Sequence, residues 1–372
     1  MPIRDVAHRA GVSVGTASNV LAGKDVVAPA TRARVLAAAD ELGYRPRPRR
    51  AHAAGNGGLL GFLVRALADP LPANDFYAGV LHGEQSVCAR AGHGLIHELV
   101  PDPGAERARL PLMVARRQVA GILAVGWMPD DLLDLLVGSG IPIVLVDYQR
   151  EPTTTDVVVG DDERGAFLAT NCLLELGHLD PPPACIMGQA RHSSLRDRLR
   201  GFRRAVAASD ATTALPEAFV RRPPTGEEAD MTHGVEAMRA LLALRRPPTA
   251  VFCVNDTIAA GALRTLRDAK VAVPDEVSLV GYDDIPLAAH TVPPLTTVRV
   301  EPALLGAQAA RHLLERIAEP GMALRHTRVL ARLVERGSTG PPPGAGTVSL
   351  ECEAGKSRAG RHATATKRNG EA

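Results

Sequence analysis

Between Leu59 and about Gly337, short runs of apolar residues alternate with longer segments in which apolar positions recur every three or four residues. A run that is apolar throughout predicts a strand buried on both faces, and the longer spacing predicts an amphipathic helix. The clearest predicted strands are LLGFLV, GILAV, IPIVLVD, TDVVVGDD, TAVFCVND, VSLVGYDD and LTTVRV. Strands that alternate with helices are typical of parallel sheets flanked by helices. This region spans about 280 residues, which is more than a single hydrophobic core usually serves. We therefore expect two α/β lobes.

Prolines interrupt this pattern at two places. Pro111 lies inside the expected second helix of the body and should kink or shorten it, because proline removes a backbone donor. The segment GHLDPPPACIMG carries three consecutive prolines, so its strand should begin late, near Ala184. Neither feature changes the predicted α/β fold.

The first 46 residues have a different pattern, which predicts three short helices at Ile3–Ala10, Val14–Ala22 and Thr31–Leu42. Ser13 precedes the second helix and is a favoured N-cap, so residues 11–13 should form a tight turn. A helix, a tight turn containing glycine and a second helix are typical of a helix-turn-helix.

The second of these helices has two contrasting faces. One is an apolar stripe that consists of Val14, Ala17 and Leu21. The other is small, uncharged and able to form hydrogen bonds, and it consists of Gly15, Ser18, Asn19 and Ala22, with Thr16 beside it. A helix that enters the major groove needs such a face, because bulky side chains would keep it from the base edges. A plain three-helix unit packed on the body would show the same periodicity, so the surrounding charge must decide.

Charge is distributed unevenly along the chain. Residues 1–58 hold nine Lys or Arg and four Asp or Glu, a net charge of +5, whereas the remainder carries −3. A basic head on an acidic body favours contact between the head and a polyanion. The five cysteines are widely spaced without a C-x-x-C pair, and no apolar run approaches ~18 residues. We therefore expect a cytoplasmic protein without a membrane span, disulfide, metal or cofactor.

Composition divides the chain into four parts. Residues 1–46 form the expected helix-turn-helix head, and residues 47–58, RPRRAHAAGNGG, are rich in Pro, Arg and Gly, as linkers are. Residues 59–337 form the expected two-lobed body. Residues 338–372 have almost no large apolar side chains and should be a disordered tail.

Polar residues follow four of the predicted strands. They are Asp147, Asp161, Asn255, Asp256, Asp283 and Asp284. In open α/β sheets, ligands bind beyond the carboxyl ends of the strands, so convergence of these ends on one crevice would suit a ligand rich in hydroxyls. For Asp256 and Asp284 we expect a role as helix N-caps instead.

The segment IRDVAHRAGVSVGTASNVLAGK, with the later TRARVLAAADELGYRP, resembles the head of the lactose-repressor/galactose-repressor (LacI/GalR) family of bacterial transcription regulators. NDTIAAGALRTLRDAKVAVPDEVSLVGYDDIPLA and the following PPLTTVRV resemble the effector domain of that family, and matching segments run from about Pro2 to Arg336. The resemblance implies a two-lobed, periplasmic-binding-protein-like body. It also implies a homodimer whose two recognition helices occupy successive major grooves of a near-palindromic operator.

The resemblance assigns roles to residues of the head. Val14 and Gly15 fall at the family's two main base-reading positions, and Asn19 falls at a third, where its amide is able to pair with adenine. The remaining residues expected at the DNA surface, mainly for phosphates, are Ser13, Thr16, Ser18 and Thr31. Because glycine offers no side chain to a base, phosphate contacts and DNA shape should carry much of the affinity.

The linker departs from the family pattern. Arg47 replaces an asparagine, and Ala53 stands at the position of a leucine that wedges into the minor groove. A methyl group does not unstack a base step as leucine does. Arg45, Arg47 and the neighbouring arginines are therefore expected to bind phosphates or a narrow minor groove. A hinge helix and a free basic linker both remain open.

In the body, the resemblance implies an effector pocket. Arg198 aligns with the arginine by which the family grips its effector, and Phe76 matches an aromatic residue that lines the pocket. By the same correspondence Asp147, Asn255 and Asp283 are pocket residues. The family's usual effectors are sugars and nucleosides. Such a small molecule acts either as an inducer, which releases the protein from DNA, or as a corepressor, which strengthens DNA binding. The sequence leaves both possibilities open.

Two other functions stay open at this point. The strand-end aspartates are compatible with a sugar-acting α/β enzyme, which turnover of a sugar or nucleoside would reveal. The body is also compatible with a cytosolic sugar-binding protein whose cationic head binds DNA without selectivity. The sequence has neither a G-x-S-x-G nucleophile elbow nor a P-loop. A non-enzymatic, effector-responsive repressor of double-stranded DNA is the favoured interpretation.

Overall fold

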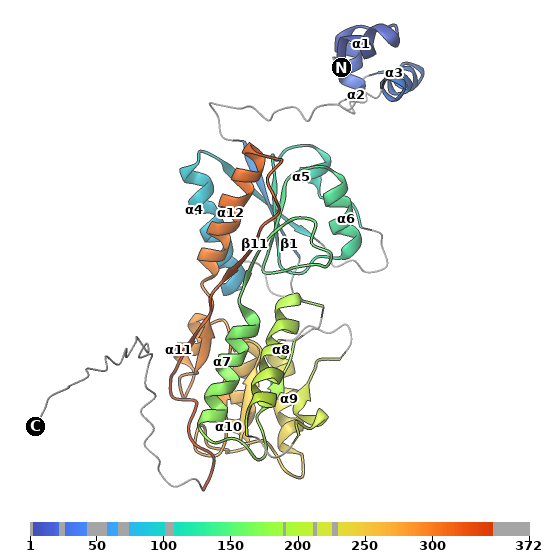
Figure 1. Cartoon of the computed structure of the whole chain (residues 1–372). Helices are drawn as coiled ribbons and strands as arrows, with labels where there is room; N and C mark the ends of the chain where they lie inside the picture. The colour runs from blue at the N-terminus through green and yellow to red at the C-terminus, as the bar shows by residue number, and fades with distance from the viewer. Residues whose placement is uncertain are drawn as a thin grey trace, which may run out of the picture.

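The computed structural model describes residues 3–21, 27–42, 58–65, 74–100, 108–188, 191–210, 214–224 and 230–344 (Figure 1). In these ranges the chain forms an N-terminal group of three helices and a body of two α/β lobes. None of the helices within them has the length and apolar character needed to cross a bilayer. The linker residues 47–57, including Arg47 and Ala53, lie outside the described residues, as does Arg45.

The N-terminal helices α1 (Ile3–Arg9), α2 (Val14–Leu21) and α3 (Pro29–Glu41) confirm the three predicted helices. They enclose a small core of their own that includes Val6, Ala17, Val20, Val35 and Ala39. The expected apolar stripe of α2 is wrong at its first residue. Ala17 and Val20 face the core, whereas Val14 in the first turn is 43% exposed.

The first lobe of the body is built on a six-stranded, all-parallel sheet with the order β11-β5-β4-β3-β1-β2. Its strands are β1 (Leu59–Arg65), β2 (Gly94–Val100), β3 (Ile122–Val125), β4 (Ile143–Val146), β5 (Asp156–Gly160) and β11 (His326–Val329). Four helices flank the sheet: α4 (Asp75–Arg90), α5 (Leu112–Ala115), α6 (Asp130–Gly138) and α12 (Pro302–Ala318). Figure 1 shows α4 and α12 on one face and α5 and α6 on the other. The central strands are buried on both faces, as their continuous apolar runs predicted.

The second lobe has a four-stranded parallel sheet with the order β7-β6-β8-β9. Its strands are β6 (Ala184–Ile186), β7 (Val220–Arg221), β8 (Ala250–Cys253) and β9 (Ser278–Val280). Its helices are α7 (Asp162–Glu175), α8 (Ser193–Ala208), α9 (Met231–Leu242), α10 (Asp256–Asp268) and α11 (Pro286–His290), with a 3-10 turn at Glu217–Phe219. The antiparallel pair β10 (Thr297–Arg299) and β12 (Arg332–Val334) lies beside two of the three passages of the chain between the lobes.

Two sequence expectations about proline are confirmed. Pro111 stands just before α5, which is a single turn of four residues instead of a full helix. The strand after the three prolines begins at Ala184. The expected disorder from Ser338 onward is wrong for residues 338–344. The Ser338 side chain is fully buried and donates a hydrogen bond to the Leu279 carbonyl at 2.6 Å, so this segment packs on the second lobe.

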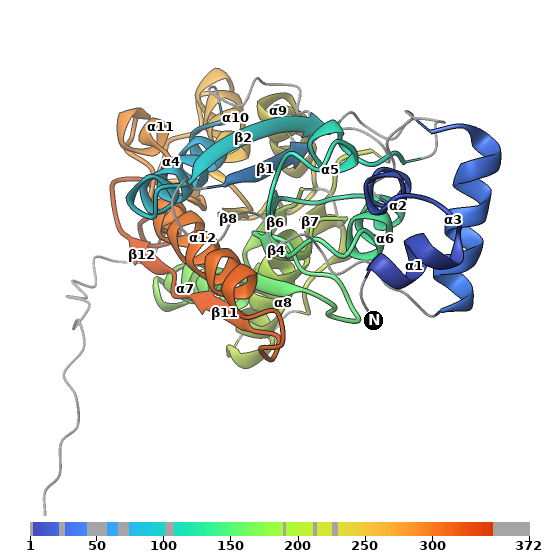
Figure 2. The same cartoon turned by 90° about the horizontal axis from the view of Figure 1, so that it is seen from above.

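Helices α4 and α12 lie side by side in both views of the molecule (Figure 1, Figure 2). They approach closely because each presents a glycine to the backbone of the other. A side chain at Gly83 would overlap the backbone of Ala303, and one at Gly306 would overlap that of Val80. This crossing therefore requires glycine for reasons of space.

A buried carboxyl group lies at this crossing. Glu84 on α4 is fully buried, and neither of its carboxylate oxygens has a hydrogen-bond partner among the described residues. A Cβ at Gly306 would stand 3.1 Å from its Cγ, which places the side chain between α4 and α12. Burial raises the pKa of Glu84 well above its usual value, so the neutral acid is favoured.

Glu84→Gln should make the free energy of unfolding less dependent on pH. In the native protein the folded state holds this proton more tightly than the unfolded state. The contribution of Glu84 to the free energy of unfolding is therefore fully present below the pKa of the unfolded state, 4.5, and decreases as the pH rises above that value. Each unit of difference between the two pKa values is worth about 1.4 kcal/mol. Urea unfolding between about pH 5 and pH 8 measures the slope, with Glu319→Gln at the exposed end of α12 as control. Identical slopes in E84Q and the native protein would contradict the assignment.

Candidate functional site

A crevice between the two lobes brings together the polar ends of several strands. It encloses about 210 Å³. The first lobe contributes Asn74, Asp75, Phe76, Tyr77 and Asp147 to its lining, and the second contributes His192, Ser194, Leu195, Arg198, Asn255, Thr257, Asp283 and Ile285. The five residues expected in the effector pocket, Phe76, Asp147, Arg198, Asn255 and Asp283, all belong to this set.

Arg198 is the principal charged group of the crevice. It extends from α8 and is 4% exposed. Its Nε donates a hydrogen bond to Asp162 Oδ1 at 2.8 Å, its Nη1 donates to the Val254 carbonyl at 2.6 Å, and its Nη2 lies 3.1 Å from Asp283 Oδ1. The guanidinium carbon lies 3.7 Å from the centre of the Tyr282 ring. These contacts hold the planar fork in a single orientation.

Two acidic residues enter the crevice at strand ends through unusual backbone conformations. Asp147 follows β4 with φ of 59°, and Asp283 lies just after β9 with φ of 97°. Such left-handed conformations are costly for residues with a Cβ, and they concentrate at functional sites. Burial raises the pKa of both carboxyls, Asp162 raises both further, and Arg198 acts in the opposite direction. The crevice thus resists a further negative charge.

The residues that follow β8 and β9 correct two expectations about helix caps. Asn255, not Asp256, caps α10, because its Oδ1 accepts a hydrogen bond from the Ile258 N–H at 2.8 Å. The Asn255 amide nitrogen is therefore oriented away from the cap. Asp256 is buried and accepts hydrogen bonds from the Thr297 hydroxyl and the Ile285 N–H, and burial raises its pKa to about 8.

Asp284 is not a cap either. Its carboxylate forms ion pairs with Arg299 on β10 and with Arg336, the latter at 2.6 Å. Arg336 also donates to the Leu295 carbonyl at 2.8 Å. The turn after β9 is therefore attached to the segments that pass between the lobes.

A histidine that sequence reasoning missed connects the two lobes. His192 precedes α8, and its Nε2 lies 3.3 Å from the Tyr77 hydroxyl and 3.5 Å from Asp147 Oδ2 in the first lobe. Its Nδ1 lies 2.5 Å from the Ser194 Oγ. Burial, reinforced by Arg198 and other arginines, lowers the pKa of His192 to about 3, so the ring is neutral at physiological pH. No motif marked His192 or Asp162, although Asp162 directly follows a predicted strand end.

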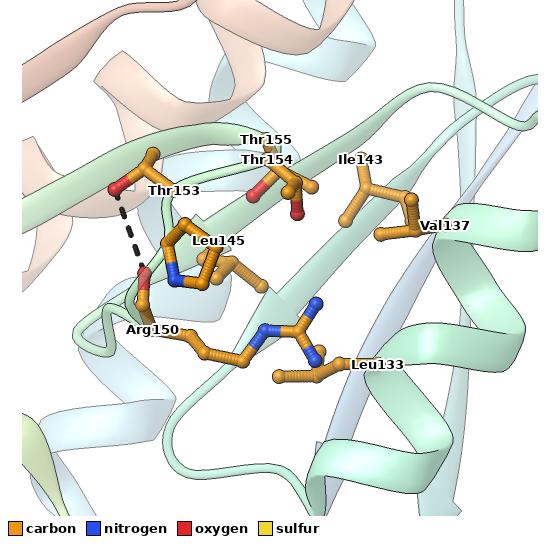
Figure 3. Close-up of a pocket in the computed structure, with 9 residues that line it drawn as sticks. Leu133, Val137, Ile143, Leu145, Arg150, Thr153, Thr154 and Thr155 are labelled. Atoms are coloured by element: carbon orange, nitrogen blue, oxygen red, sulfur yellow. Dashed lines mark hydrogen bonds between the residues drawn. The ribbon is translucent and has the colours of Figure 1, made fainter.

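A second hollow lies on the first lobe, away from these charged groups. Figure 3 shows it between α6 and the loop before β5, where Leu133 and Leu145 face Arg150 and Thr155. It encloses about 10 Å³, which is space for a single water molecule at most. This hollow is therefore too small for an organic ligand.

The head presents an uncharged surface around Gly15, Ser18 and Asn19, as the sequence predicted, whereas Ala22, the fourth residue expected on this face, lies outside the described residues. Ser13 caps α2, because its Oγ accepts a hydrogen bond from the Thr16 N–H at 3.0 Å, and its hydroxyl lies 2.8 Å from that of Thr16. Val14 and Gly15 are exposed, and Thr16, Ser18 and Asn19 are half-buried. Thr31 is half-buried in the first turn of α3. An ion pair between Arg9 and Glu41 joins α1 to α3.

Comparison with known families and proteins covers almost the whole chain. Residues 2–47 match the model of bacterial regulatory proteins of the lacI family, and residues 170–339 match that of the periplasmic binding protein-like domain. The HTH-type transcriptional repressor PurR of Photobacterium profundum is 34% identical over 339 residues, which cover 90% of this chain and 98% of the relative.

Solved structures show the same similarity. A complex of the transcriptional regulator CelR with cellobiose is 32% identical and covers 91% of this chain and 99% of its own, with a TM-score of 0.69. The lac repressor dimer bound to operator and the anti-inducer ONPF is 25% identical, with the same coverage and a TM-score of 0.66. The likeness thus includes both the head and the two-lobed body.

The His192 ring should stay uncharged between about pH 5 and pH 8, because its pKa is lowered to about 3 by burial. Its ring-proton resonance in an NMR titration, assigned by its loss in His192→Gln, should not move over this range. The remaining histidine resonances of the same sample serve as reference. A midpoint for His192 near 6.5 would contradict the buried, cross-lobe position.

Proposed function

The chain belongs to the lacI family of bacterial regulatory proteins, and we propose that it is a ligand-responsive transcription repressor that binds a near-palindromic operator as a homodimer. One observation carries the proposal. A single chain joins a helix pair with an exposed, uncharged face to a ligand-sized crevice between two lobes. The similarity to PurR over nearly the full length of both proteins supports it.

On the DNA side, α2 acts as the recognition helix. Val14, Gly15 and Asn19 face the base edges in the major groove, because this part of the helix is small and uncharged. The residues that hold the head on the phosphates are Ser13, Thr16, Ser18 and Thr31, with Arg45 and Arg47 following the head. The hydroxyl groups and helix N-terminus suit phosphate oxygens. Ala53 lies in the linker and supplies no wedge for the minor groove.

On the ligand side, the crevice binds a small effector of the sugar or nucleoside class. Asp147 and Asp283 accept hydrogen bonds from hydroxyls, and Arg198 and the Asn255 amide donate to their oxygens. Phe76 offers an aromatic face to a ring. Each group lines the same 210 Å³ of space.

Coupling between the two sites follows from the division into lobes. A ligand that binds both lobes favours one angle between them and shifts the population of DNA-competent dimers. An inducer and a corepressor differ here in which angle they favour. The protein binds its effector and releases it unchanged, as a regulator does, and is not an enzyme. It acts in the cytoplasm, where its DNA operator is located.

Selection of bound duplexes from a random DNA pool, at near-physiological salt, tests the DNA side. The full-length protein should enrich a palindrome. Asn19→Ala should lose selectivity by roughly tenfold at one base pair per half-site, because one bidentate base contact is worth about 1–3 kcal/mol, while nonspecific affinity holds. Leu36→Ala, exposed on α3, is the control. Retention that falls with salt but enriches no motif would instead indicate a nonspecific cationic head.

Arg198→Lys should weaken effector binding at least tenfold. The substitution keeps the charge but removes the fork that contacts Asp162 and Asp283, and lysine does not reproduce that geometry. Sugars and nucleosides are first screened for compounds that change the affinity of the protein for its operator. Calorimetry then measures the affinity of the native protein and of R198K for an active compound. Arg203→Lys, exposed on the same helix, should bind as the native protein does. Equal affinity in R198K and native protein would remove Arg198 from the site.

A further inference from the structure

The start of α8 contacts the first lobe through residues that do not line the crevice. The helix belongs to the second lobe and begins at the boundary between the two lobes (Figure 1). Gln149, which follows β4 in the first lobe, donates a hydrogen bond from its backbone N–H to Ser193 Oγ at 2.9 Å. Its side-chain Nε2 donates a second hydrogen bond to Asp197 Oδ2 at 3.2 Å. These two bonds join the lobes beside the crevice without occupying it.

Just before α8, a third contact crosses between the lobes, and it involves a tryptophan. Trp127 follows β3 and packs against the core of the first lobe. The guanidinium carbon of Arg65, at the end of β1, lies 5.2 Å from the centre of the indole ring, and that of Arg191 lies 4.9 Å from it. Arg65 belongs to the same lobe as the ring, whereas Arg191 belongs to the second lobe. A guanidinium within about 6 Å of an aromatic centre is attracted to its π-electrons.

The three contacts form one unit because their members are grouped on both sides. In the second lobe, Arg191, Ser193 and Asp197 lie in one short stretch at the start of α8. In the first lobe, Trp127 and Gln149 follow the neighbouring strands β3 and β4. Ser193 and Asp197 are buried, so their bonds to Gln149 form away from most of the solvent, where hydrogen bonds are stronger. A rotation of the lobes that separates one pair therefore separates the others.

We propose that Trp127 and Gln149 are positioning residues that form a latch with Arg191, Ser193 and Asp197. The latch holds the two lobes together along the side of the crevice where α8 begins. Because none of the five residues lines the crevice, the latch sets the population of closed molecules without contact with an effector. This inference rests on the proposed function, in which the angle between the lobes determines operator affinity.

Exchange of donor and acceptor between Gln149 and Asp197 tests the latch. Gln149→Glu places a carboxylate against the Asp197 carboxylate, so the two groups repel and the lobes separate. The double variant Q149E/D197N has an acceptor at position 149 and a donor at position 197, and therefore restores a hydrogen bond between the lobes. Local damage to either lobe would persist in the double variant, whereas the opening of a latch is reversed. Gln149→Ala removes the amide without adding charge and should act as Q149E does, to a smaller extent.

Trp127 reports the state of the latch because it is the only tryptophan in the sequence. Quenching of its fluorescence by acrylamide, measured on the full-length protein alone, gives the access of solvent to the ring. Arg191 moves away from the ring when the lobes separate. The quenching constant should therefore rise about twofold or more in Q149E and return to the native value in Q149E/D197N.

Two further variants separate the latch from local effects on fluorescence. Arg65→Gln removes the guanidinium that belongs to the same lobe as Trp127, and Arg203→Gln changes an exposed residue farther along α8. On the operator obtained by DNA selection, Q149E should change the affinity by about threefold or more, because the latch is coupled to the head. R65Q and R203Q should bind the operator as the native protein does. Thermal unfolding confirms that each variant is folded.

The two measurements have separate consequences. An unchanged quenching constant in folded Q149E or Q149A, or no recovery in Q149E/D197N, would overturn the latch. Unchanged operator affinity in a variant whose Trp127 has become accessible would overturn its part in regulation. The quenching measurement requires neither DNA nor effector. If the DNA selection enriches no palindrome, the proposed function fails, while the contact between the lobes is still decided by quenching.

Discussion

The buried cation at Arg198 is the interaction on which the body of this protein depends. A guanidinium that is 4% exposed must be paired, because removing one partner of a buried ion pair typically costs about 3–5 kcal/mol. Asp162 at the start of α7 and Asp283 after β9 provide that pairing. Asp283 also lines the crevice, together with Asp75 and Asp147, so one of the carboxylates that pair with the guanidinium faces the space between the lobes.

The neighbouring residues Asp283 and Asp284 connect ligand chemistry to the geometry of the lobes. Asp283 lines the crevice, and its N–H donates to the Val298 carbonyl of β10 at 2.8 Å. Asp284 forms ion pairs with Arg299 and Arg336. Arg299 is the last residue of β10 and Arg336 follows β12, and both strands lie next to the segments that cross between the lobes. The two aspartates therefore connect the wall of the crevice to the segments that cross between the lobes. On the opposite side, the contact of His192 with Tyr77 and Asp147 joins the lobes directly.

The head separates two physical tasks that a DNA-binding unit must perform. The exposed face of α2 around Gly15 is small and neutral, which permits close approach to base edges. Along the sequence, most of the positive charge of residues 1–58 follows that face, since residues 32–50 contain six arginines. The neutral face and most of the positive charge therefore belong to different parts of the head sequence.

The sequence by itself determined the local elements, because these depend on neighbours along the chain. Continuous apolar runs predicted the central strands, Ser13 predicted the cap of α2, and Pro111 predicted a shortened helix. The strand-end rule and the family resemblance also selected residues that line one crevice, since the carboxyl ends of parallel strands meet at one edge.

Tertiary structure decided what depends on partners distant in the chain. Asp162 and His192 join the crevice through contacts with Arg198 and Tyr77, which no spacing in the sequence reveals. The cap of α10 falls on Asn255 and not one residue later, because the Asp256 side chain finds buried donors across the lobe. Ser338 is ordered for the same reason, since its hydroxyl bonds to a strand 59 residues earlier. Periodicity records which face of an element is buried, but the chemistry of a site depends on which other elements that face meets.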